Sequence, residues 1–94
     1  MLTPVGLAHW IMGDGYFQYN AVIICTDNFS LNEVNKLIEV LYKNFGLLSE
    51  RKTRRNPNRN VVWRIKIKLE SMEKLKELVI PYFIPEMLYK LGIK

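Results

Sequence analysis

The sequence predicts an α+β domain in which helices cover one side of a mixed or antiparallel sheet. The first observation is the order of elements that the periodicities indicate: helix, two strands, helix, two strands, helix and short helix. The second is the length of 94 residues, which is that of one domain. We therefore expect a single domain that spans residues 1–94 and contains a four-stranded sheet.

The first helix begins after Thr3, a suitable N-cap, with Pro4 as its first residue, and runs for about three turns to roughly Gly13. Two short strands follow, over residues 16–20 and 21–26, joined by a tight turn. The second strand is apolar and rich in branched residues, which predicts a central position in the sheet.

A second helix begins at a capping box formed by Ser30 and Glu33, and its apolar residues recur at helical spacing until Gly46. Ser71 is the expected N-cap of a third helix, which Pro81 stops. A short last helix is expected over residues 85–91.

Between these helices, strands at residues 47–53 and 60–69 form a second pair around a polar tip at residues 54–59. The later strand alternates between apolar and cationic side chains. Its apolar face, expected to lie in the core, consists of Val61, Trp63, Ile65, Ile67 and Leu69. Its cationic face consists of Arg64, Lys66 and Lys68.

This hairpin holds more than half of the 14 lysines and arginines, and the stretch from Arg51 to Leu69 contains no acid. The eight basic residues are Arg51, Lys52, Arg54, Arg55, Arg59, Arg64, Lys66 and Lys68. A two-stranded ribbon fits the major groove of B-DNA. We expect Arg64, Lys66 and Arg51 to point at bases, and the tip arginines Arg54, Arg55 and Arg59 to contact phosphates. The alternative is a solubilising surface hairpin.

The overall composition agrees with an acidic partner. The formal net charge is +5 and the pI is near 9.5, which suits a polyanion. The single cysteine, Cys25, cannot form an internal disulfide, and no Cys/His cluster has zinc-ligand spacing. No signal peptide or membrane-spanning run is visible, so we expect an intracellular protein.

Asp14 is the first candidate for chemistry. A carboxylate at a helix C-terminus faces the negative end of the helix dipole, which costs roughly 0.3 to 1 kcal/mol. A hard divalent cation bound by Asp14 and a helix-end carbonyl such as that of Gly13 would compensate. The alternative is that Gly13, Asp14 and Gly15 form only a cap and a turn.

The nonapeptide at residues 7–15 resembles the motif of the LAGLIDADG homing endonucleases. The matching residues are Leu7, Ala8, Ile11, Asp14 and Gly15, with Gly13 in place of another small residue. His9, Trp10 and Met12 depart from the naming sequence, although Trp10 and Met12 are similar to the mitochondrial intron-encoded branch. Residues 2–4, 26–30 and 80–91 also resemble the second half of a two-motif member, so the resemblance covers nearly the whole chain.

The resemblance implies a curved four-stranded sheet over double-stranded DNA and a site-specific endonuclease that uses Mg²⁺. It places catalytic roles on Asp14 and on Lys90, with Lys68 as a weaker alternative for the lysine. Because one motif supplies one carboxylate, two motif helices must pack together, as a homodimer or with the missing half of a two-motif enzyme. Gly6, Ala8 and Gly13 are the small residues that would allow close approach, and a mitochondrion or other organelle is the implied location.

A non-cleaving protein remains the alternative. A splicing maturase, or a ribosomal or RNP component derived from this fold, would bind RNA and not cut DNA. A third reading is a DNA-binding module without cleavage. His9 is expected to be packed or to lie at an interface, since it lies inside the motif helix.

Overall fold

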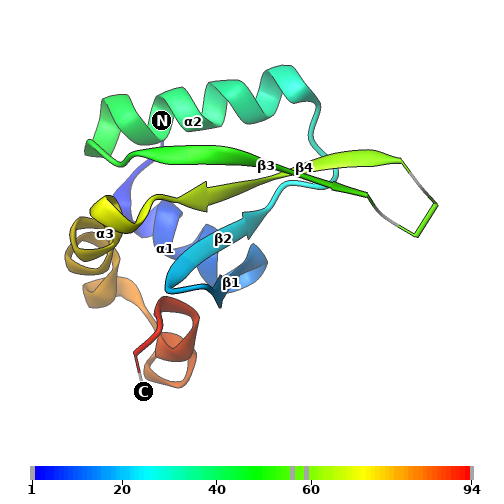
Figure 1. Cartoon of the computed structure of the whole chain (residues 1–94). Coiled ribbons are helices and arrows are strands. Elements are labelled where there is room, and N and C mark those ends of the chain that lie inside the picture. Colours follow the sequence, from blue (N-terminus) through cyan, green and yellow to red (C-terminus); the bar gives the residue numbers. More distant parts are fainter. Residues whose placement is uncertain (1, 56, 59, 94) are drawn as a thin grey trace.

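The centre of the fold is a four-stranded antiparallel sheet with the strand order β1-β2-β4-β3. The structure is a computed structural model, and it describes residues 2–55, 57–58 and 60–93. The elements, in chain order, are α1 (Pro4–Asp14), β1 (Gly15–Gln18), β2 (Ala21–Cys25), α2 (Leu31–Phe45), β3 (Ser49–Arg55), β4 (Val61–Ile67), η1 (Leu69–Ser71), α3 (Met72–Val79), η2 (Ile80–Tyr82) and η3 (Pro85–Leu91). The α+β class and the order of elements are confirmed (Figure 1).

The predicted caps and turns of the first half are present. The Thr3 hydroxyl accepts a hydrogen bond from the Gly6 amide at 3.1 Å, and Ser30 and Glu33 form both hydrogen bonds of the capping box. The turn between β1 and β2 consists of Tyr19 and Asn20, whose φ angles of 53° and 64° are both left-handed. These local signals therefore determine where α1, α2 and the first hairpin begin and end.

Two details around the start of α3 differ from the sequence predictions, although Ser71 does precede the helix as its N-cap residue. Ser71 makes no side-chain capping bond, and its hydroxyl accepts a hydrogen bond from the Leu48 amide at 2.8 Å. Leu69 does not extend the core face of β4, because the strand ends at Ile67 and Leu69 begins a 3₁₀ turn in which it is 59% exposed. The last helix, η3, has 3₁₀ and not α-helical geometry.

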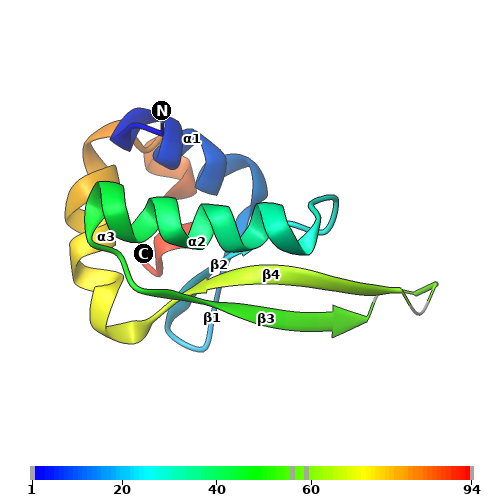
Figure 2. The ribbon, with the colours of Figure 1, turned by 90° about the horizontal axis from the view of Figure 1, so that it is seen from above.

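The two faces of the sheet have different surroundings. Strand register places Ile24 beside Ile65, and these fully buried side chains pack with α1, α2 and α3 in one core. The opposite face, which we call the open face, carries Tyr16, Ile23 and Lys66 in register across β1, β2 and β4. The helices lie on the side away from the open face, and the β3–β4 hairpin extends beyond them (Figure 1, Figure 2). Among the described residues, no helix is long and apolar enough to cross a membrane.

Candidate functional site

The C-terminal end of α1 places Asp14 at the surface with little freedom. Leu7, Ala8 and Ile11 are fully buried, so the middle of the helix is anchored in the core. Asp14 is its last residue and is exposed. Gly15 follows at once in β1, where an added Cβ would lie 2.7 Å from the Ile11 carbonyl oxygen. Only glycine therefore allows the direct passage from α1 into β1 that holds Asp14 at this corner.

The structure brings Lys90 to the same end of α1. Its ammonium donates a hydrogen bond to the Met12 carbonyl at 2.5 Å, one of the carbonyls that a helix C-terminus leaves unpaired. Lys90 belongs to η3, which ends at Gly92 in a left-handed conformation, with φ of 78°. A cation at this position also meets the negative end of the helix dipole. Asp14 and Lys90, which are distant in sequence, thus share one helix end.

The donors at this end fit part of a magnesium site. Asp14 offers an exposed carboxylate, and Gly13 is exposed with nothing within 4 Å of the position of a Cβ. Oxygen ligands of this kind suit Mg²⁺, which often takes only one or two carboxylates and fills its other positions with water and phosphate oxygens. Within the described residues no three His, Cys, Asp or Glu side chains gather around a point. Among the described residues, Asp14 is therefore the one carboxylate that this end of α1 offers to such an ion.

Basic side chains gather on the open face of the sheet. Lys66 lies on β4, while Lys52 and Arg54 lie on the same face of β3. With Arg64 they line a groove of about 270 Å³ whose other walls are Tyr16, Gln18, Tyr19, Ile23 and Thr53. Arg54 and Arg55 are exposed near the end of the hairpin, and Arg59 lies outside the described residues. This arrangement agrees with the predicted cationic face of β4.

Arg51 was predicted to point at bases, and this is wrong. Register pairs Arg51 with Ile65, so the two side chains share the face that carries the helices. The Arg51 guanidinium donates a hydrogen bond to the Asn35 side chain of α2 at 2.7 Å. The pattern of charges along β3 did not show which residues share a face with Arg64, because that depends on the pairing between the two strands.

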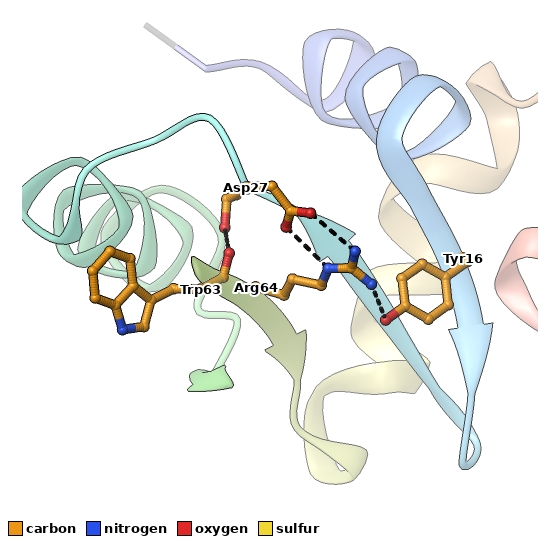
Figure 3. A network of polar contacts seen from close by, with 5 residues as sticks. Tyr16, Asp27, Trp63 and Arg64 are labelled. Atoms are coloured by element: carbon orange, nitrogen blue, oxygen red, sulfur yellow. Dashed lines mark hydrogen bonds and ion pairs between the residues drawn. The ribbon is translucent and has the colours of Figure 1, made fainter. Parts of the chain in front are cut away.

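Arg64 lies on the open face, but its guanidinium is already bound (Figure 3). Nε and Nη2 each donate to one oxygen of the Asp27 carboxylate at 3.0 Å, and Nη1 donates to the Tyr16 hydroxyl at 3.1 Å. The hydrogen bond from Arg64 lowers the pKa of Asp27, and the same carboxylate raises the pKa of Arg64. The fork that would read a guanine is therefore occupied by Asp27, which corrects the predicted role of Arg64.

Acids on the open face were missed by sequence reasoning. Glu50 precedes the acid-free stretch by one residue, lies 3.5 Å from the Lys52 ammonium and is in register with Lys66. Lys68 lies beyond the end of β4 and lines a separate shallow hollow with Glu50 and Glu70. The surface around Lys52 and Lys68 therefore has less net positive charge than the count of basic residues indicated, whereas no acid lies beside Arg54 in the strand register.

The three small residues that were expected to let two motif helices pack closely lie in different surroundings. Ala8 is fully buried in the core of its own chain, so it does not offer a surface to a second helix. Gly6 is half-buried and Gly13 is exposed. His9 was expected either to pack within the chain or to lie at an interface. It is exposed, so the first of these two predictions is wrong.

Comparison with known proteins places this geometry in a family. Residues 1–75 match the sequence profile of the LAGLIDADG DNA endonuclease family. The chain therefore belongs to that family, as its motif helix and sheet indicated.

Three relatives show how the chain relates to longer proteins. It is 41% identical to the intron-encoded endonuclease ai4 of Dictyostelium discoideum over 93 aligned residues. That alignment covers 99% of this chain and 57% of the relative. It is 37% identical to the cytochrome b mRNA maturase bI2 of Saccharomyces cerevisiae, over 97% of this chain and 21% of the relative. The structure of the homing endonuclease I-WcaI bound to its DNA recognition sequence matches with a TM-score of 0.81 and 35% identity, over 95% of this chain and 40% of that chain. The chain thus spans about one fifth to three fifths of the length of these relatives.

Proposed function

We propose that residues 1–94 act as one domain of a site-specific endonuclease that binds double-stranded DNA on the open face of the sheet and cuts both strands. The observation that carries the proposal is the junction of α1 with β1. It places the exposed Asp14 two residues before Tyr16, a residue of the basic groove. The DNA-bound structure of the similar homing endonuclease supports duplex DNA as the partner.

Binding relies on cations that the chain holds in place. Lys66 and Arg54 line the groove and attract the phosphate backbone, which provides affinity that does not depend on sequence. Lys90 uses one of its three N–H groups on the Met12 carbonyl, which leaves two for an oxygen of the scissile phosphate. In this role Lys90 stabilises negative charge as it develops on the phosphate.

Asp14 and the Gly13 carbonyl would hold the divalent cation, for which we propose Mg²⁺. When bound, such an ion stabilises charge on the attacking and leaving oxygens of phosphodiester hydrolysis. The role of Asp14 is to fix the position of that charge at the end of a helix whose other residues are buried. Its exposure leaves the carboxylate accessible both to the ion and to a phosphate group.

Cleavage of two strands requires two such ends, and we propose that two α1 helices pack side by side in a homodimer. Gly6 and Gly13 remain the small residues of this interface, and the exposed His9 lies on the same helix. Two carboxylates about 4 Å apart repel by roughly 4 kcal/mol at an effective dielectric of 20, and a shared cation relieves that repulsion. The greater length of the relatives supports a second arrangement, in which the other motif belongs to a longer chain.

For location we propose a mitochondrion or a related organelle. The support is the similarity to an intron-encoded endonuclease and to a maturase of cytochrome b mRNA. Fractionation of cells that express the chain with an epitope tag tests this location directly.

A second candidate function is RNA binding in splicing without cleavage. It is favoured by the similarity to the cytochrome b mRNA maturase bI2, which the alignment covers over 97% of this chain. A basic groove attracts RNA phosphates as it attracts DNA phosphates. The two functions differ in their need for Asp14, because a binding protein has no use for a carboxylate at the end of α1.

The test is cleavage of a randomised duplex library by the purified chain with Mg²⁺, followed by sequencing of the cut products. We expect a double-strand cut at one sequence class. Asp14→Asn should lower cleavage at least about a thousandfold while thermal stability without metal stays equal or rises, because a carboxylate at the helix C-terminus is unfavourable. Glu39→Gln on α2 is the matched control, since Glu39 is an exposed acid that pairs only with Lys43 among the described residues. Retained cleavage by Asp14→Asn would remove Asp14 from the mechanism, and RNA binding without any cut would favour the second candidate.

A further inference from the structure

The Tyr16 hydroxyl is held by a polar network on the open face. Arg64 donates to it at 3.1 Å, and the Arg64 guanidinium also lies 5.6 Å from the centre of the Tyr16 ring. Asp27 fixes Arg64 from the other side through two hydrogen bonds of 3.0 Å (Figure 3). The segment that carries Asp27 is itself anchored, because the buried Thr26 donates a hydrogen bond to the Trp63 carbonyl at 2.6 Å.

The direction of these hydrogen bonds determines what Tyr16 can offer. Arginine carries only donors, so the Tyr16 oxygen must accept from Arg64. The phenolic proton is not used in that contact, and within the described part of the chain no group accepts it. Tyr16 lines the basic groove, so its O–H is available as an oriented donor in the place where the proposed duplex lies.

The local charge indicates which acceptor suits this donor. Asp27 and Arg64 form an ion pair whose side chains are 37% and 16% exposed, and the pair has no net charge. A phosphate brought to Tyr16 would meet the Asp27 carboxylate nearby, whereas phosphates are better placed at Arg54 and Lys66 along the groove. A neutral acceptor on a base edge carries no such repulsion.

We propose that Tyr16 is a specificity residue, which donates a hydrogen bond from its hydroxyl to a base-edge acceptor in the major groove: a purine N7, a guanine O6 or a thymine O4. Arg64 and Asp27 are positioning residues, which hold the hydroxyl and direct its proton into the groove. This inference rests on the proposed binding of duplex DNA. It also replaces the reading of Arg64 as a residue that contacts guanine through its own fork.

The experiment compares base preferences of the chain and of Tyr16→Phe, by selection from a randomised duplex library without divalent metal. Phenylalanine removes only the hydroxyl oxygen and its proton. We expect the preference to relax at one base pair, with affinity for the preferred duplex about fivefold lower, as for one typical hydrogen bond. The dependence of affinity on salt should not change, because the same phosphates stay bound. Tyr42→Phe, on the exposed surface of α2, is the matched control.

The positioning roles are tested by a double-mutant cycle. Asp27→Asn should relax the same base pair, and it should have no further effect on that preference once Tyr16 is phenylalanine. An unchanged preference in Tyr16→Phe, or a change in the salt dependence that indicates a phosphate contact, would overturn the inference while leaving the proposed function intact. A parent chain that binds no duplex DNA would overturn both.

Discussion

Helix α1 and the β3–β4 hairpin carry the two halves of the proposed function, and the chain holds them by different means. Four residues of α1 are buried, and Asp14 follows them with no intervening loop. In β3, by contrast, Ser49 and Glu50 are half-buried and the other five residues are exposed, so the strand depends on its pairing with β4. Under the proposed function, the catalytic end of α1 requires exact placement, which a packed core provides, whereas phosphate binding along the hairpin requires only positive charge in roughly the right place.

Among variants that leave Asp14 and Lys90 themselves unchanged, the largest effect should follow from disturbing the end of α1 through Gly92. Its φ is 78°, and an added Cβ would lie 2.5 Å from the Phe17 ring, so Gly92→Ala should shift η3 and move Lys90 from the Met12 carbonyl. We expect the free energy of unfolding to fall by about 2 kcal/mol. Cleavage at a temperature where the variant is folded should fall about a hundredfold, because small displacements at a reacting centre are costly.

Gly46→Ala is the control for backbone strain alone. Gly46, which follows the C-terminal end of α2, also has a left-handed φ, of 67°. A Cβ added there would meet only the flexible end of the Lys74 side chain. It should lower stability by about 1 kcal/mol without changing cleavage by the folded protein. Equal loss of cleavage in the two variants would mean that the placement of Lys90 at the end of α1 does not matter for cleavage.

A smaller effect should follow from removing charge at the end of the hairpin. Replacement of Arg54 and Arg55 together by glutamine should weaken duplex binding and flatten its salt dependence by about 0.9 for each phosphate that the variant no longer binds. The cleavage rate of duplex that is already bound should change little. Affinity measured at several salt concentrations provides the slope.

The matched control replaces Lys36 and Lys74, which are exposed on α2 and α3, away from the open face. It removes the same formal charge from another surface. A parent-like slope in the hairpin variant, or an equal change in both variants, would contradict phosphate binding by Arg54 and Arg55.

The smallest effect concerns acid and the Asp27–Arg64 pair. Arg64 lowers the pKa of Asp27 below its ordinary value near 3.8, so the pair contributes stability above that pH and loses it as pH falls through the lowered value. Because Asp27 is partly exposed, the contribution should be at most about 1 kcal/mol. Denaturation of the parent and of Asp27→Asn between pH 6 and pH 2.5 should show a stability difference that shrinks in acid. A constant difference over this range would contradict the assignment.

The sequence predicted best what depends on residues close together in the chain. The capping box of α2 and the start of α1 are local patterns, and both are present in the structure. The alternation along β4 holds for Trp63, Ile65 and Ile67, whereas Val61, predicted in the core, is 41% exposed near the end of the hairpin. Lys90 was assigned through its resemblance to a family segment, and the structure places it at the same helix end as Asp14. Its catalytic role and that of Asp14 remain proposals.

Long-range partners could not be predicted in the same way. Asp27 and Arg64 are 37 positions apart, and no pattern indicated that the loop after β2 would bring a carboxylate to the cationic face of β4. Arg51 was assigned to the wrong face because the pairing of β3 with β4 sets its direction. Ser71 was assigned as a cap, but its hydroxyl binds the backbone of Leu48, 23 positions away.

The central claim is that two motif helices act on one duplex, and the stoichiometry of the bound complex tests it most directly. Sedimentation of the Asp14→Asn chain with Mg²⁺ and a selected duplex keeps the DNA uncut while the complex forms. The account predicts two chains on each duplex, a protein mass of about twice 11.1 kDa. A complex that saturates at one chain per duplex would contradict the homodimer.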